Sequence, residues 1–439
     1  MSDALEAVSF WQAFRFWLKL GFISFGGPAG QIAIMHKELV ERRRWISEKR
    51  FLHALNYCMA IPGPEAQQLA TYIGWLMHRT AGGIAAGVLF VLPSLVLLVG
   101  LSWIYAAFGH LALVQGLFAG IKPAVMALVI AALYRIGSRT LKHPLLWILA
   151  VLSFGAVFLF SLPFPLVIAA AAGLGILGGR MMPGAFLATD PKSPTTDVPA
   201  VEEPAAEHTR FRWSRTLRYA ALGLVLWVVP LGALSLAFGW QGTLAQMAWF
   251  FTQAALVTFG GAYAVLPFVF QGAVSTYGWI TPSQMIDGLA LGETTPGPLI
   301  IVVSFIGFLG AWSHQVFGPD ALVLAGVAGA LVVTWFTFLP SFLFVLIGGP
   351  LIEATQGDLR WSAPLTAITA AVVGVMVSLA VFFAIHVLWP AGLADAFHVP
   401  SALLALAAAV ALLVFRRSAI EVIGGSALVG LALAAGGLR

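Results

Sequence analysis

The sequence predicts an all-α polytopic membrane protein. Of its 439 residues, 60% are hydrophobic and only 9% are charged, whereas a soluble domain carries roughly 25% charged residues. Nine uninterrupted apolar runs come near the ~20 residues that a membrane-spanning helix needs. Glycine- and proline-rich breaks also occur at matching places in the two halves, which predicts a fold built from two repeats.

The breaks are the most regular feature of the sequence. The first half contains Gly26-Gly27-Pro28 and Pro62-Gly63-Pro64. The second half contains Gly260-Gly261 and Pro296-Gly297-Pro298, each 234 residues further along the chain. No gap is needed to align them, so an internal duplication is the simplest explanation.

The chemistry of proline and glycine explains why helices should end at the breaks. Proline lacks an N–H and clashes with the preceding turn, and glycine costs backbone entropy. The next helix then begins with free N–H groups and a positive dipole end, which attract an anion. Unwound backbone inside a membrane is tolerated only where protein buries it or it lines a cavity, and such discontinuous helices mark transporter substrate sites. Ordinary helix kinks are the alternative interpretation.

Composition divides the chain into two repeats and a connection. Residues 1–180 are predicted to form the first repeat, 181–213 a cytoplasmic flexible linker, 214–240 a linking transmembrane helix, and 241–439 the second repeat. Helices at 10–24, 29–35, 51–61 and 65–77 flank the first two breaks. Spanning helices are expected at 84–105, 111–134, 145–161, 163–179, 219–238, 321–347, 364–389, 400–415 and 418–437.

Charged residues predict the orientation of the repeats. The stretch 36–50 contains six Lys or Arg residues, whereas its counterpart 270–284 has no charged residue. Because basic loops stay in the cytoplasm, the repeats are predicted to be inverted. Residues 135–143 are also basic, and they reach the same side only if the broken segments are re-entrant hairpins. Each repeat then has two re-entrant hairpins and about four spanning helices. The alternative is thirteen segments that all cross.

Three ionisable residues lie in apolar surroundings. Lys122 falls inside the run 111–134, where a charge is expensive, so it is a functional candidate unless it snorkels or pairs with Glu65. Glu65 follows Pro64, and its carboxylate could simply cap the free N–H groups of the helix that begins there. Glu293 lies on the other side of its break, where the helix dipole disfavours a negative charge, so its carboxylate is expected to take up a proton readily. Glu293 and Glu65 are therefore the candidates for coupling transport to protons. Neutral donors near the breaks, each of which could equally join two helices, are Ser24, Gln67, Gln68, Thr258, Thr294 and Thr295.

Several kinds of chemistry lack a sequence signal. The single Cys58 excludes a disulfide framework, and the nine histidines include no pair spaced as metal ligands on one helix face. No phosphate-binding loop and no nucleophile with a base partner is recognisable. We therefore expect no cofactor, no metal and no ATP-driven coupling. The net charge of +5 comes from loops, so no nucleic-acid partner is expected.

Six stretches carry a likeness to a known family: Lys19–Pro28, Ala60–Pro64, Val91–Ser94, Gly120–Ala124, Thr258–Gly261 and Thr294–Pro298. In these stretches, and over nearly the whole chain outside 181–213, the sequence resembles the long, two-domain form of the chromate ion transporter family. One departure is Ala262, which stands where the first half has Pro28.

The resemblance implies a secondary transporter of chromate in a bacterial inner membrane, exporting chromate and conferring resistance. Sulfate is the related oxyanion. The alternatives are a carrier of sulfate or another oxyanion, a passive channel, and a membrane-embedded enzyme or lipid-phosphate handler. Small residues at 400–437, including Gly424, Gly425 and Gly430, suggest a homodimer. The expected substrate-binding residues are Gly26, Gly27, Pro28, Pro62, Gly63, Pro64, Gln67, Lys122, Gly260, Gly261, Thr294, Thr295, Pro296, Gly297 and Pro298.

The re-entrant topology can be tested by cysteine labelling in a Cys58→Ser background. Cysteines at Ser47 and Ser138 should be shielded from an impermeant thiol reagent outside intact cells, because both basic stretches are cytoplasmic. A cysteine at Ser275 should be labelled. Opposite labelling of Ser47 and Ser138 would contradict re-entrance while leaving the inverted repeat intact.

Overall fold

The computed structural model describes residues 8–25, 27–186, 211–355, 362–390, 392, 394 and 396–436. These residues form helices and connecting loops without a strand, which confirms the all-α fold class. The elements of the first half are α1 (Phe10–Ile23), α2 (Gly27–His36), the π-helical η1 (Lys37–Arg42), α3 (Glu48–Ala60), α4 (Glu65–Phe108), α5 (Ala112–Thr140), α6 (Pro144–Phe158), α7 (Phe164–Met181) and the short α8 (Pro183–Phe186).

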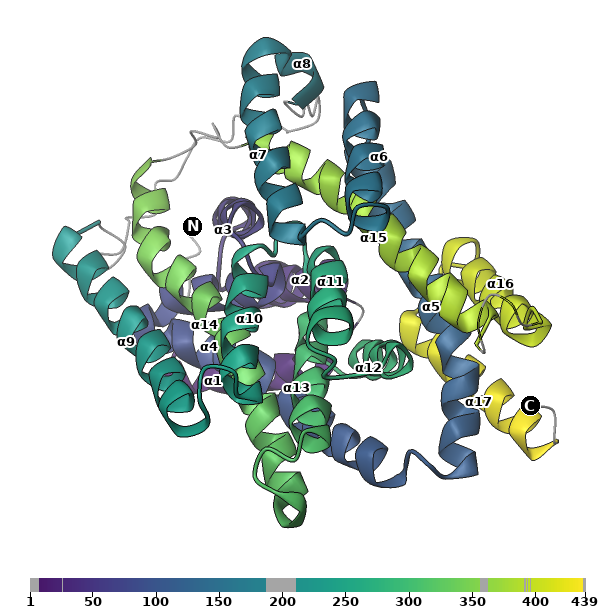
Figure 1. Cartoon of the computed structure of the whole chain (residues 1–439). Helices are drawn as coiled ribbons and strands as arrows, with labels where there is room; N and C mark the ends of the chain where they lie inside the picture. The colour runs from purple at the N-terminus through teal and green to yellow at the C-terminus, as the bar shows by residue number, and fades with distance from the viewer. Residues whose placement is uncertain are drawn as a thin grey trace.

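The second half follows helix α9 (Trp213–Phe238), which lies at one edge of the molecule in Figure 1. Its elements are α10 (Thr243–Leu256), α11 (Ala262–Phe270), the π-helical η3 (Gln271–Thr276), α12 (Pro282–Thr294), η4 (Leu299–Ile301), α13 (Val302–Ser313), η5 (Pro319–Ala321), α14 (Leu322–Thr355), α15 (Ser362–Leu388), α16 (Val399–Leu413) and α17 (Ala419–Ala435).

Six helices in the described part of the chain are long and apolar enough to cross a membrane. They are α4, α5, α7, α9, α14 and α15, which agrees with a polytopic membrane protein. The runs predicted at 145–161, 400–415 and 418–437 form α6, α16 and α17, which have 15, 15 and 17 residues. These three fall short of the ~20 residues that cross a bilayer perpendicularly.

The two halves contain matching elements in the same order. Both π-helical segments, η1 and η3, begin 234 residues apart and precede a loop in which backbone N–H groups bond back to one carbonyl. In the first half Trp45 and Ile46 donate to Leu39, and in the second half Trp279 and Ile280 donate to Ala273. The orientation of the halves in a membrane stays a prediction, as does the re-entrance of the hairpins.

Helix α4 is a hairpin rather than one long span. His78 and Arg79 have non-helical backbone angles, and Arg79 has a φ of +55°. Gly74 and Gly82, on either side of this reversal, pack so closely that a Cβ on either would strike the other's carbonyl oxygen. Gly307 of α13 and Gly329 of α14 make the same approach in the second half. Glycine at these positions lets the two arms of each hairpin touch through their backbones.

Each half also packs against the last helices of the other half. Helix α5 contacts α16 and α17, and α15 contacts α6 and α7. Figure 1 shows α16 and α17 beside α5 at the edge opposite α9. Gly430, on which the expected homodimer partly rested, packs against Gly116 and Gly120 of the same chain. Gly424 and Gly425 face open space.

The beginning of the predicted linker is packed rather than solvated. Phe186 at the end of α8 is buried, and its ring lies directly over Gly178 of α7. Burying the apolar ring against the glycine stabilises the folded protein. The Pro- and Thr-rich composition of the segment gave no indication of this contact. Residues 187–210 of the predicted linker lie outside the described residues.

Helix α5 continues to Thr140, so Arg135 and Arg139 are helical rather than in the predicted loop.

Candidate functional site

The breaks of one half meet the breaks of the other. The Gly63 N–H donates to the carbonyl of Thr258 over 2.7 Å. The Gly297 N–H donates to the carbonyl of Ser24, also over 2.7 Å. Each Pro-Gly-Pro break is therefore bonded to the glycine-rich break of the opposite half. The four breaks that the sequence predicted separately form two crossed pairs.

A serine from the opposite half stands against each central glycine. Gly63 has a φ of +132°, and a Cβ there would strike the hydroxyl oxygen of Ser341. Gly297 has a φ of +100°, and a Cβ there would strike the hydroxyl oxygen of Ser94. Both serines follow a proline inside a long helix, and neither was among the residues predicted for the site. A Leu-Pro-Ser triplet occurs in each of these two helices, and this repetition is the sequence feature that could have drawn attention to the serines.

Buried glutamines join the broken backbone. Gln31 Nε2 donates to the carbonyl of Ser24 over 3.3 Å and also to that of Gly297. Gln68 Nε2 donates to the carbonyl of Pro62 over 2.7 Å, and Gln67 Nε2 donates to Thr71 Oγ1 over 3.0 Å. The bonds from Gln31 and Gln68 satisfy carbonyls at the breaks, whereas the bond from Gln67 ends on a hydroxyl within α4. Gln31 was not predicted as a site residue.

The helices that begin at the breaks have no side-chain cap. Pro64, Gly261 and Pro298 occupy the N-cap positions of α4, α11 and η4, and none of them makes a side-chain capping bond. By contrast, Ser9 and Thr281 cap α1 and α12 with their hydroxyl oxygens. Proline and glycine carry no acceptor that could cap a helix. The first-turn N–H groups after the breaks are therefore left for another acceptor.

The hydroxyl groups around the breaks differ in what they can offer. Thr258, Thr294 and Thr295 donate to carbonyls of their own helices. A hydroxyl has one hydrogen, so these three act only as acceptors in this arrangement. Ser24 and Ser341 are fully buried, and their hydroxyl oxygens have no hydrogen-bond partner among the described residues. They are the hydroxyl donors that remain available at the crossed breaks.

Both predicted proton-coupling carboxylates lie near the second glycine-rich break. A Cβ on Gly261 would be 4.0 Å from Glu65 Oε1, so the Glu65 carboxylate reaches the opposite half. Glu293 is buried and accepts a hydrogen bond from the hydroxyl of Tyr263, which follows the same break. Residues 234 positions before Tyr263 and Glu293 are Ala29 and Met59, so this pair exists only in the second half.

Lys122 belongs to a separate charged cluster. Its Nζ donates to Ser283 Oγ over 2.6 Å and lies 3.7 Å from Asp287 Oδ1. Asp287 is buried and accepts a hydrogen bond of 2.8 Å from the hydroxyl of Tyr105. The structure thus pairs Lys122 with Asp287 rather than with Glu65. Asp287 precedes Thr294 by seven residues, which is about 10 Å along α12, so Lys122 does not join the crossed breaks here.

The remaining predicted site residues either lie outside the described residues or make few contacts at the crossed breaks. Gly26 lies outside the described residues. Gly27 has a φ of +74°, and no atom lies within 4 Å of the position a Cβ would take. Gly260 has a φ of +77°, and a Cβ there would lie 3.7 Å from the methyl carbon of Thr369. No group of three or more His, Cys, Asp or Glu side chains in the described chain could hold a metal ion.

Comparisons with known proteins identify the family to which these apolar helices belong. The sequence profile of the chromate transporter family matches residues 11–176 and 245–431. This chain belongs to the chromate transporter family. The chromate transport protein of Cupriavidus metallidurans is 30% identical over 96% of this chain and 92% of its own length. That of Pseudomonas aeruginosa is 33% identical over 84% of this chain and 80% of its own.

A probable chromate transport protein from Synechococcus elongatus is 30% identical over 85% of each chain. No solved structure matches this chain. Family membership and the apolar helices make the protein a multi-pass membrane transporter rather than an enzyme. The membrane-embedded enzyme considered from the sequence is therefore set aside.

The close contact at Gly63 leads to a stability prediction. Gly63→Ala should destabilise the transporter by ~2–5 kcal/mol, because the new Cβ meets Ser341 and alanine tolerates a positive φ poorly. Thermal unfolding of the purified protein in detergent measures the loss. The matched control is Gly173→Ala in α7, where the Cβ enters open space and stability should hold or rise slightly. Equal melting temperatures for both variants would show that the Gly63 contact is unimportant.

Proposed function

We propose that this transporter carries chromate across a bacterial inner membrane, exporting it and thereby conferring chromate resistance. The observation that carries the proposal is the crossing of two uncapped, glycine- and proline-rich breaks from opposite halves. Breaks of this kind at a repeat interface are where secondary transporters bind their substrates. The names of the relatives supply chromate as the substrate, and sulfate is the alternative of the same charge and shape.

The crossed breaks suit a tetrahedral dianion. Hydrogen bonds from N–H groups to a charged acceptor contribute roughly 1.5–3 kcal/mol each. The unused donors are the first-turn N–H groups of α4 and α11 and the hydroxyls of Ser24 and Ser341. Together they supply donors from both halves to one anion. Such donors recognise charge and size rather than the central atom, so sulfate should compete with chromate.

A pair of carboxylates offers a route for coupling to protons. A dianion repels a nearby carboxylate, so its arrival favours protonation of Glu65 and Glu293. The Tyr263 hydroxyl holds Glu293 beside the second glycine-rich break. Proton uptake would thus accompany substrate binding, which is how we infer that a proton gradient drives transport.

Lys122 fits a role at one end of the anion path. In this structure its ammonium group is neutralised by Asp287 and hydrogen-bonded to Ser283. An approaching anion would compete with Asp287 for the same ammonium group. We infer that Lys122 exchanges Asp287 for the substrate before the anion reaches the breaks.

The proposed mechanism uses the two halves as inverted repeats with re-entrant hairpins. Three observations support it: the elements match in order, the bonds Gly63–Thr258 and Gly297–Ser24 are related by the 234-residue offset, and the family profile matches two segments. Rocking of one half against the other would then expose the breaks to either side. Residues 1–180 and 241–439 are the two proposed repeats. A homodimer through Gly424 and Gly425 stays a prediction.

Transport by inverted membrane vesicles tests the function. Vesicles containing the protein should accumulate labelled chromate, and accumulation should collapse when the pH gradient is removed. Excess sulfate should inhibit uptake and excess nitrate should not, because nitrate is monovalent and planar. Vesicles without the protein give the background. Uptake equal to that background, or chromate flux unaffected by sulfate, would contradict the proposal.

The Lys122–Asp287 pair can be tested by separating stability from transport. Lys122→Met should abolish chromate uptake, and it should destabilise the protein by about 3–5 kcal/mol because Asp287 loses its partner. The double variant Lys122→Met and Asp287→Asn should recover stability but not transport. Uptake and thermal unfolding are the two measurements.

A purely structural pair would behave differently. In that case the double variant would recover transport together with stability. Thr369→Ser, beside Gly260 in the second half, serves as a control that keeps a hydroxyl and should leave uptake close to that of the parent.

A further inference from the structure

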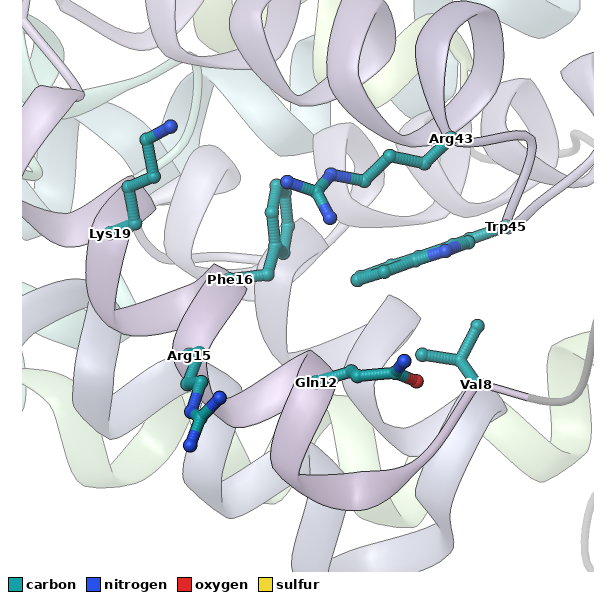
Figure 2. A pocket seen from close by; sticks show the side chains of 7 residues that line it. All are labelled: Val8, Gln12, Arg15, Phe16, Lys19, Arg43 and Trp45. Atoms are coloured by element: carbon teal, nitrogen blue, oxygen red, sulfur yellow. The ribbon is translucent and has the colours of Figure 1, made fainter.

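A polar cavity with a volume of about 610 Å³ lies beside α1. Figure 2 shows Gln12, Arg15 and Lys19 along this helix, with Arg43 and Trp45 approaching from the segment after η1. Val8 and Phe16 complete the lining. None of the residues at the crossed breaks belongs to this cavity, which we call the α1 pocket.

The α1 pocket carries positive charge without matching negative charge. Arg15 and Lys19 are exposed, and neither makes a hydrogen bond or ion pair within the described part of the chain. The Arg43 guanidinium lies over the rings of Phe16, at 5.1 Å, and Trp45, at 4.8 Å. Two unpaired cations and a stacked third one make the pocket a site for an anionic group.

Glu38 offsets only part of this charge. Its Oε2 lies 3.5 Å from Arg43 Nε, and its Oε1 accepts a hydrogen bond of 2.7 Å from Arg42. Partial burial acts to raise the pKa of Glu38, but the hydrogen bonds and charges of Arg42 and Arg43 outweigh it and lower that pKa. Glu38 therefore stays ionised and neutralises one of the two arginines.

The α1 pocket also has apolar surface, and exposed aromatic rings lie on the helix face beside it. Val8, Phe16 and Trp45 supply apolar surface beside the charges, and Arg43 lies over the two aromatic rings. At 3.6 residues per turn, the exposed Trp11 and Phe22 lie on the same side of α1 as Arg15. A helix face that mixes aromatic rings with arginine and lysine is typical of the boundary between lipid headgroups and acyl chains.

We propose that the α1 pocket binds the phosphate group of an anionic phospholipid from the leaflet on the predicted cytoplasmic side. The cations would hold the phosphate, and the apolar surface would contact the glycerol and upper acyl chains. The volume exceeds what a single tetrahedral oxyanion needs, and an inorganic anion gains nothing from apolar surface. A soluble phosphate shares the headgroup chemistry but lacks the acyl chains. The proposal does not depend on chromate being the substrate.

Native mass spectrometry of the purified full-length transporter tests the assignment. Dioctanoyl phosphatidylglycerol and dioctanoyl phosphatidylcholine are titrated onto the delipidated protein, and the bound lipid is counted. Phosphatidylglycerol should bind at least tenfold more tightly. The double variant Arg15→Gln and Lys19→Gln should weaken its binding by roughly tenfold to thirtyfold, the size expected for two interfacial cations.

The control variant carries the same loss of charge outside the pocket. Lys37→Gln with Lys49→Gln removes two exposed cations from the neighbouring basic stretch and should leave lipid binding unchanged. Equal weakening by this control would overturn the proposal in favour of general surface charge.

Competition identifies the source of the bound anion. Glycerol 3-phosphate, inorganic phosphate and chromate are each added in excess to the lipid-bound protein, and none should displace the lipid. Displacement by either phosphate would assign the pocket to a free anion instead. Displacement by chromate would make it a loading site for the transported anion and would likewise overturn the lipid assignment.

Discussion

Two backbone hydrogen bonds, from Gly63 to Thr258 and from Gly297 to Ser24, hold the breaks of the two halves against each other. Almost every feature of the site depends on them. A broken helix inside an apolar fold exposes N–H and carbonyl groups that cannot be left unpaired. Each half supplies the partners that the other half lacks. The requirement for glycine follows, because a side chain at either central position would strike a serine of the opposite half.

The residue types at the breaks also explain why hydrogen-bond donors remain unpaired there. The backbone of the breaks forms hydrogen bonds with the opposite half, but proline and glycine have no side-chain acceptor that could cap the next helix. The first-turn N–H groups of that helix therefore remain available. Buried serine hydroxyls without partners at Ser24 and Ser341 add to this supply. Unsatisfied buried donors cost free energy, and a bound anion is the group that would satisfy them. Under the proposed function, the bound anion would therefore stabilise this arrangement.

The two halves have equivalent frames but different charges. Glu65 is specific to the first half, whereas Tyr263 and Glu293 are specific to the second. The ion pair between Lys122 and Asp287 is not repeated, because the residue 234 positions before Asp287 is His53. Matching backbone contacts in the two halves thus carry different charged side chains, which would give the two ends of the proposed anion path unlike charges. The α1 pocket adds a third charged region whose residues lie in and around α1 and η1.

The sequence by itself determined the helical class, the positions of most helices outside residues 241–318 and the four breaks, because hydrophobic runs, proline and glycine act locally along the chain. Helix lengths were less certain, since the short runs of α6, α16 and α17 look like spans in composition. Only the tertiary structure decided which breaks meet. It placed Ser341 and Ser94 behind the glycines, gave Lys122 the partner Asp287 rather than Glu65, and folded Phe186 of the predicted linker onto α7. These contacts join residues up to 278 positions apart, as with Gly63 and Ser341, and a single sequence carries no local signal for such pairings. Their physical cause is the packing of whole helices, which decides afterwards which side chains come within reach.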